Sequence, residues 1–166
     1  ENNIQNNGTL TLVGGGRLCT NISGDGNVVI NNSSGFVVSV ADDNIISESI
    51  TINNGANLNA SANSIGGNVI NNGQLHLWGG TLTHNIAGTG YTGIHGNTET
   101  SANNLLTNIS LSGFTESEEI SLTLTDGTLQ RVISNGNNAN NNIIIDGDVL
   151  SSPSNLLVNV SVNDGA

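Results

Sequence analysis

The sequence predicts an all-β chain that coils into a right-handed parallel β-helix, and three observations carry that prediction. The first is composition, because Asn, Gly, Ser and Thr make up 86 of the 166 residues while only four residues are aromatic. The second is an alternation of leucine with polar residues in short runs, which is the period-2 pattern of half-buried strands. The third is internal repetition at intervals that fit coils of about 20 residues, as in solenoid proteins.

Composition also excludes several other fold classes. Asn and Gly form helices poorly, which argues against a helical bundle. The single cysteine, Cys19, cannot support a disulfide framework, and we expect it to pack half-buried as a small hydrophobic residue. Disorder of the whole chain is disfavoured because 35% of the residues are hydrophobic, mostly Ile, Leu and Val, and only 9% are charged.

Three stretches repeat one arrangement: an alternating leucine pair, then a leucine and an isoleucine four residues apart, then a glycine or asparagine at a turn. The leucine pairs are Leu10 and Leu12, Leu75 and Leu77, and Leu122 and Leu124. Leu10 and Leu75 are 65 residues apart and Leu75 and Leu122 are 47 apart, intervals that fit about three and about two coils. We therefore expect similar segments to stack directly over one another, with the leucines inward.

A weaker unit, an asparagine followed by two aliphatic residues, fills the gaps between these copies. It occurs at residues 44–46, 104–106, 142–144 and 155–157 and predicts a polar corner followed by a short buried strand. Asparagine stacked over asparagine in neighbouring coils would form ladders of amide hydrogen bonds. These elements together predict seven or eight coils.

An antiparallel β-sandwich is the alternative fold, because Asn-Gly is also a hairpin signal. Residues 68–70 and 74–77 flank the Asn-Gly turn at 72–73 and would pair as a hairpin. That pairing leaves Leu82 and Ile86 without a partner, whereas parallel coiling uses every copy of the repeat. Parallel coiling is therefore the favoured interpretation.

We expect residues 1–166 to form a single β-helix segment of a longer chain, with no internal domain boundary. The sequence begins at Glu1 without a methionine, a basic region or an apolar leader. We therefore expect any targeting signal to lie elsewhere in that longer chain.

The formal net charge is −11, and Arg17 and Arg131 are the only arginines in a chain without lysine. Two arginines so far apart cannot form the basic stripe that nucleic acids need. The same shortage disfavours anionic membrane surfaces, and no apolar run is long enough for membrane insertion. We expect a surface rich in uncharged amides, which suits contact with sugars.

Residues 52–90 contain a set of motifs that point to a known family. The motifs are Asn-Asn-Gly at 71–73, the alternating leucine strand at 74–77, Gly-Gly-Thr-Leu at 79–82 and Ile-Ala-Gly-Thr-Gly at 86–90. In these motifs the chain resembles the passenger repeats of bacterial autotransporter and filamentous-haemagglutinin-like adhesins. The segments that carry the resemblance best are residues 6–30, 50–96 and 120–136.

The resemblance implies a structural, non-catalytic stalk segment of a secreted or surface-displayed bacterial adhesin. Such passengers are usually fused to an outer-membrane translocator barrel, and these 166 residues show no barrel pattern. A barrel would therefore be a covalent continuation of the chain. Host or environmental glycans, or surface proteins, are the partners that the resemblance implies.

Trp78 and His76 are the candidate ligand-binding residues, as glycan contacts. Leu75 and Leu77 alternate with them on one predicted strand and point inward, so both side chains should point outward. An exposed tryptophan on a polar face is a platform on which a sugar ring can stack. The alternative is that Trp78 packs under a loop or beside a neighbouring coil.

The titratable residues show no spacing typical of a metal site. His76, His84 and His95 lack the tight spacing of metal ligands, so we expect three solvent-facing histidines, although His76 and His95 are about one coil apart. Asp42-Asp43 and the Asp-Gly-Asp at 146–148 lack the spacing of a calcium loop and are expected to form polar corners.

A carbohydrate-active enzyme, such as a polysaccharide lyase or hydrolase, is a further alternative. Asp42-Asp43 and the Ile-His-Gly at 94–96 faintly resemble elements of polygalacturonases, but the Asn-Thr-Asp and Arg-Ile-Lys elements of that family have no counterpart. A lyase acting on uronates would also need a basic residue beside the substrate carboxylate. We therefore expect no catalytic residues, no cofactor and no metal.

Overall fold

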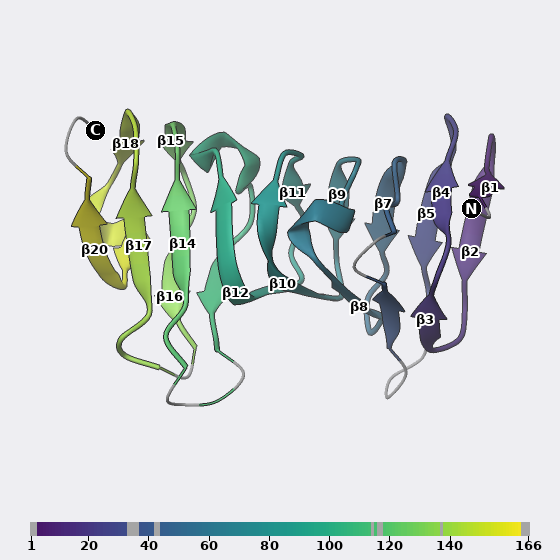
Figure 1. The fold of residues 1–166 in the computed structure, drawn as a ribbon, viewed down its shortest axis with the longest axis horizontal. Helices are drawn as coiled ribbons and strands as arrows, with labels where there is room; N and C mark the ends of the chain where they lie inside the picture. Colours follow the sequence, from purple (N-terminus) through teal and green to yellow (C-terminus); the bar gives the residue numbers. More distant parts are fainter. Residues whose placement is uncertain are drawn as a thin grey trace.

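The computed structural model describes residues 3–32, 37–41, 44–113, 115, 118–136 and 138–163. Figure 1 shows the strands side by side along one axis, from the N-terminal coil to the C-terminal coil. Every strand pair in the described ranges is parallel and joins consecutive coils. The chain is therefore a parallel β-helix of about 8 coils, as predicted, and the antiparallel β-sandwich is excluded.

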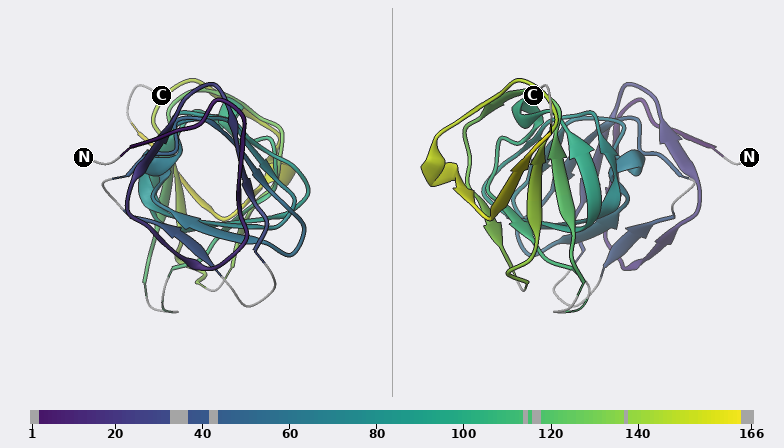
Figure 2. Two further views of the ribbon diagram at one scale, coloured as in Figure 1. Left: turned by 90° about the vertical axis from the view of Figure 1, so that its right-hand side faces the viewer. Right: turned by 60° about the vertical axis from the view of Figure 1, so that its left-hand side comes forward.

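Each coil contributes one segment to each of three faces, and the coils superpose when viewed along the axis (Figure 2, left). Face 1 consists of β3 (Gly16–Leu18), β6 (Val38–Val40), β8 (Asn57–Ala60), β10 (Gln74–Leu82), β12 (Tyr91–Thr100), β13 (Ile109–Leu111), β16 (Ile133–Asn135) and β19 (Leu156–Leu157). Two of these strands, β10 and β12, continue around a corner onto face 2.

Face 2 and face 3 complete the coils. Face 2 also holds β1 (Asn3–Gln5), β4 (Asn21–Ser23), β14 (Ser121–Leu124), β17 (Asn142–Ile145) and β20 (Asn159–Val162). Face 3 holds β2 (Thr9–Leu12), β5 (Asn27–Ile30), β7 (Ser49–Ile52), β9 (Val69–Asn71), β11 (Ile86–Ala87), β15 (Gly127–Leu129) and β18 (Val149–Ser151).

Three short 3-10 helices lie at corners between the strands. They are η1 (Ala62–Ser64), η2 (Ala102–Asn104) and η3 (Pro153–Asn155). Within the described ranges, no helix has the length and apolar character needed to cross a membrane.

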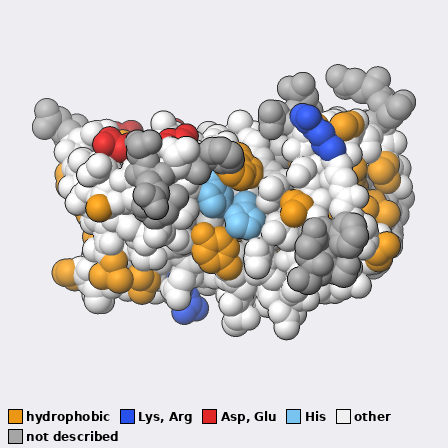
Figure 3. Space-filling model, turned by 90° about the horizontal axis from the view of Figure 1, so that it is seen from below, with side chains coloured by type: hydrophobic (Ala, Val, Ile, Leu, Met, Phe, Trp, Pro, Cys, Tyr) orange, Lys and Arg blue, Asp and Glu red, His pale blue; other side chains and the backbone are white. Residues whose placement is uncertain are grey.

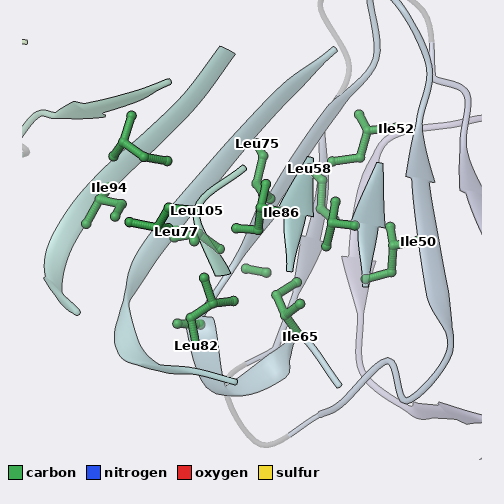
Figure 4. Close-up of a cluster of buried hydrophobic side chains, with 14 of the residues drawn as sticks. Ile50, Ile52, Leu58, Ile65, Leu75, Leu77, Leu82, Ile86, Ile94 and Leu105 are labelled. Carbon is green, nitrogen blue, oxygen red and sulfur yellow. The ribbon is translucent and has the colours of Figure 1, made fainter. Parts of the chain in front are cut away.

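The inward side chains of successive coils form aliphatic columns. Leu77, Ile94 and Leu111 align in register on face 1, and all three are fully buried. Figure 4 shows Leu77 and Ile94 with isoleucines and leucines from the other faces, all turned toward one interior. Each coil therefore covers the apolar side chains of its neighbours, which is how a chain with few aromatic residues removes enough apolar surface from water.

A buried polar pair interrupts one of these columns. Thr92 is polar, yet it pairs with the buried Leu75 of the neighbouring coil and is itself only 1% exposed. The Asn71 amide donates a hydrogen bond of 3.0 Å to the Thr92 hydroxyl and another of 2.7 Å to the Tyr91 carbonyl. Because both polar groups find partners, their burial is tolerated, and Asn71 fixes the start of β12.

The Asn-Asn-Gly motifs of the first two repeat copies form equivalent corners. In each, the amide oxygen of the first asparagine accepts from the glycine N–H, at 3.1 Å for Asn6 and 3.0 Å for Asn71. Each side-chain nitrogen then donates to a carbonyl of the next coil. Amides also link coils directly, as where Asn53 donates to Asn31 at 2.9 Å. Direct contacts between asparagines of neighbouring coils therefore exist as single pairs, whereas at the Asn-Asn-Gly corners the amides bond backbone carbonyls in place of the predicted ladder.

The three repeat copies do not stack over one another, which corrects the expectation from their spacing. Leu10 lies on face 3, Leu75 on face 1 and Leu122 on face 2. On face 3, successive strand pairs connect Leu10 to Val69, which lies three coils further along. Leu75 comes six residues after Val69 and therefore lies on the next face, face 1. The motif recurs on every face because each face needs a corner followed by an alternating strand.

The weaker Asn-aliphatic unit forms a regular strand in only some of its copies. Ile46 and Leu105 are buried but make isolated bridges, whereas Ile143 lies within β17 and Leu156 begins β19. One aliphatic residue of the first three units is fully buried, so the expected inward side chain is present even where the strand is not.

Candidate binding groove on face 1

The predicted contact residues lie on the outer surface of β10. Leu75 and Leu77 are fully buried, whereas His76 is half-buried and Trp78 is 42% exposed. The alternation of the strand therefore places both candidate side chains outward, as the sequence predicts.

A β-bulge brings a third aromatic side chain to them. Leu77 pairs with Ile94, but Trp78 pairs with Gly96, so His95 is an extra residue in β12. Bulges of this kind re-aim a side chain and bend the strand. Here the bulge places His95 between His76 and Trp78.

Four rings form a continuous row on this surface. The Trp78 and His95 rings stack with centroids 4.7 Å apart at 25°. The His95 and His76 centroids are 4.9 Å apart, and those of His76 and Tyr91 are 5.5 Å apart. Figure 3 shows two adjoining histidines in the middle of this face with hydrophobic side chains beside them. We name Trp78, His95, His76 and Tyr91 the aromatic row.

Gly93 makes room for the aromatic row. It pairs with His76 and lies between Tyr91 and His95 on β12. A Cβ atom at this position would lie 2.6 Å from His95 Nε2 and 2.8 Å from the Tyr91 hydroxyl oxygen. The two rings therefore occupy space that a side chain would fill in any other residue.

The histidines are joined by a directed chain of hydrogen bonds. His95 Nδ1 lies 2.6 Å from the Ser112 carbonyl oxygen, which can only accept, so Nδ1 carries the proton. His95 Nε2 then holds a lone pair and accepts from His76 Nδ1 at 2.8 Å. His76 Nε2 is left as an acceptor.

Burial favours the neutral form of both rings. Desolvation lowers the pKa of His76, and the positive charge that His95 can carry lowers it further. Desolvation also lowers the pKa of His95, partly offset by the hydrogen bond to the Ser112 carbonyl. Both imidazoles are therefore neutral near pH 7.

Two adjoining grooves flank Trp78. One has a volume of about 360 Å³ and is lined by Val37, Asn57, Asn59, His76, Trp78, His95, Ser112 and Gly113. The other has a volume of about 420 Å³ and is lined by Gly16, Arg17, Val37, Ser39, Val40, Asn59, Ala60, Ser61 and Trp78. Both are lined by Val37, Asn59 and Trp78, so we treat the two as one site, the face 1 groove.

The polar lining of the face 1 groove consists of amides, imidazoles and serines, with Arg17 as its one charged side chain among the described residues. The side-chain oxygens of Asn57 and Asn59 are buried and have no hydrogen-bond partner within the described ranges. Buried acceptors of this kind usually find a partner, because leaving one unpaired is costly. The groove thus offers amide, imidazole and serine side chains, one guanidinium group and an aromatic surface to a polar ligand.

The other residues considered as candidates are not among those that line the face 1 groove. His84 contacts Thr83 rather than the other histidines. Asp146 accepts a hydrogen bond of 2.6 Å from the Asn163 amide, which fits a polar corner. Asp42-Asp43 lie outside the described residues. Cys19 is exposed, which corrects the expectation that it packs half-buried.

The sequence predicts the outward positions of Trp78 and His76 but not most of the residues that surround them. The expectation of three solvent-facing histidines is wrong for His76 and His95, which contact each other and are half-buried. Their separation of about one coil was the available signal. Asn59 carried no such signal, because it is one of 31 asparagines.

Among the described residues, no three His, Cys, Asp or Glu side chains gather where they could hold a metal ion. Comparison with protein-family models, curated proteins and solved structures finds no match to this chain.

Proposed function

We propose that this chain is a rod segment of a secreted or surface-displayed bacterial adhesin of the autotransporter or filamentous-haemagglutinin type, without catalysis of its own. The observation that supports the proposal is the stack of parallel coils, whose buried aliphatic side chains form a single cluster. Each coil adds about 4.8 Å to such a rod. Backbone hydrogen bonds between coils run along the rod axis, so the architecture suits a part that holds other regions away from a cell.

Surface labelling tests this proposal. Antibodies raised against the chain should label intact cells of the source organism, and the label should disappear after brief treatment of those cells with an external protease. An antibody against a cytoplasmic protein serves as the control and should label only permeabilised cells. Labelling by the chain-specific antibody only after permeabilisation would contradict the proposal.

Binding of a neutral glycan in the face 1 groove is a second candidate function. It is favoured by the exposed Trp78 ring in a groove that Asn57 and Asn59 also line, two residues whose amide oxygens lack a partner among the described residues. A sugar ring would stack on the indole while its hydroxyl groups bond the amide and imidazole side chains that line the groove. The uncharged lining near His76 and His95 suits hydroxyl groups better than a charged ligand.

A glycan array with matched variants tests this second candidate. Wild-type chain should retain a defined set of glycans, and Trp78→Ala should lose most of that binding. Leu150→Ala is the control, because Leu150 is 70% exposed on β18, away from the groove. Equal binding by wild type and Trp78→Ala, or no retained glycan at all, would remove this candidate while leaving the rod proposal standing.

A further inference from the structure

We propose that His76 and His95 form a two-histidine site for a divalent transition-metal ion of the Cu²⁺ or Zn²⁺ class. The ligands would be His76 Nδ1 and His95 Nε2, and the remaining coordination positions would open into the face 1 groove. This inference goes beyond the proposed rod function and does not depend on it.

The spacing of the two nitrogens fits metal coordination. They lie 2.8 Å apart. Two metal–nitrogen bonds of about 2.0 Å meeting at a right angle place their nitrogens about 2.8 Å apart, and a tetrahedral angle widens this to about 3.3 Å. The ion would lie to one side of the line between the nitrogens, so each ring would turn by about 35–45° to aim its lone pair at the ion. The His76 proton would move from Nδ1 to Nε2, so that both ligands stay neutral imidazoles.

The surroundings of His95 match those of a metal ligand. Metal-binding histidines usually donate their other ring N–H to a carbonyl or carboxylate, which fixes the tautomer and the ring orientation. His95 Nδ1 donates to the Ser112 carbonyl at 2.6 Å and thereby directs Nε2 toward His76. Stacking on Trp78 holds the same ring on its other side. His95 therefore already has the tautomer that a metal ligand at Nε2 needs.

Two further side chains that carry oxygen atoms lie on the strands beside the pair. The Tyr91 hydroxyl and His95 Nε2 both lie over Gly93, within 2.8 Å and 2.6 Å of the position that a Cβ would occupy there. Asn59 pairs with His76 on the neighbouring strand, and its buried amide oxygen lacks a partner among the described residues. Either oxygen, or groove water, can complete a site with imidazole and oxygen ligands.

The charge around the pair also favours a cation. The groove lining next to the pair carries no charged side chain within the described residues, and the chain has a net charge of −11. The acidic chain therefore attracts divalent cations rather than repelling them.

The tryptophan provides a direct readout of this site. Trp78 is the only tryptophan in the chain, and its ring lies 4.7 Å from that of His95. Bound Cu²⁺ is paramagnetic and should quench its fluorescence strongly, with saturation at one equivalent of Cu²⁺. Excess Zn²⁺ has no such effect and should restore the emission by competition. The protein should be free of any histidine tag and carry Cys19→Ser, because Cys19 is exposed.

Matched variants complete the test. His76→Gln and His95→Gln should each abolish saturable quenching, whereas His84→Gln should leave it unchanged, because His84 lies outside the aromatic row. Quenching that is unsaturable, or equal in all three variants, would overturn the proposal. Electron paramagnetic resonance of the Cu²⁺-loaded parent protein should show hyperfine coupling to two imidazole nitrogens, and none or one would overturn it even if a variant misfolds.

Discussion

His76 and His95 release their protons more readily in the folded chain than free imidazoles do, because both rings are half-buried. The unfolded chain, with imidazole pKa values near the usual 6.5, therefore binds more protons than the folded chain once the pH falls below about 6.5. The contribution of these rings to stability is fully present above that pH and is lost as the pH falls toward the lower pKa values of the folded state.

This linkage makes a prediction for the double variant His76→Gln/His95→Gln. The urea midpoint of the wild type should fall between about pH 7.5 and about pH 5, and that of the double variant should fall less, because it lacks both groups. His84→Gln keeps both buried rings and should follow the wild type. The prediction is wrong if the double variant and the wild type lose stability in parallel.

For a single residue, the sequence predicts which side of a strand its side chain occupies better than it predicts which side chains of other strands it contacts. The outward positions of His76 and Trp78 follow from two flanking leucines, and both are confirmed. The contact with His95 depends on which residue of β12 is the extra one. Nothing in the composition of the stretch marks that position beforehand.

At the scale of the element, β10 shows how the inward leucines stabilise a coil. Leu77 is fully buried between the coils of β8 and β12, in register with Ala60 and Ile94. Leu77→Ala should lower the free energy of unfolding by about 2–5 kcal/mol, because the close-packed column can only partly close around the cavity.

The control for this element is Ile70→Ala, on β9 of the same coil. Ile70 is 52% exposed, so removing its side chain leaves no cavity and should change stability by no more than about 0.5 kcal/mol. Both variants are compared by urea denaturation. Equal effects of the two substitutions would show that the inward assignment of Leu77 is wrong.

The bulge explains why the strands β10 and β12 could be predicted from the sequence while the pairing of their residues could not. Up to Leu77, the residues of β10 pair with β12 at one constant sequence separation, and from Trp78 onward that separation is longer because His95 has been passed over. An alternating pattern indicates that two strands exist and which side of each is buried. It does not indicate where one strand has an extra residue, and that extra residue is what positions His95.

At the scale of the whole molecule, coil length varies enough to uncouple sequence repeats from faces. On face 3, Leu10 pairs with Val28 and Val28 pairs with Ile50, so the second of these coils is longer than the first. Two copies of a repeat can therefore be separated by a whole number of average coil lengths and still lie on different faces. This is why the fold class followed from the repeats, while the stacking of the copies did not.

Because each coil contacts only its neighbours, stability should be graded along the axis. In the isolated 166-residue chain, amide hydrogen exchange should be slowest in β10 and β12, whose inward residues are covered on both sides. It should be fastest in β1 and β20, whose residues are all exposed. Mass spectrometry of peptides from these strands measures the gradient.

Leu77→Ala extends this prediction to the coupling between coils. Its loss of packing should speed exchange in β8, β10 and β12 well before it affects β20, because no strand pairing joins β20 directly to these strands. The trend should weaken with each coil away from Leu77. Uniform protection along the wild-type chain, or equal acceleration of every coil in the variant, would instead show that the β-helix opens as one cooperative unit rather than coil by coil.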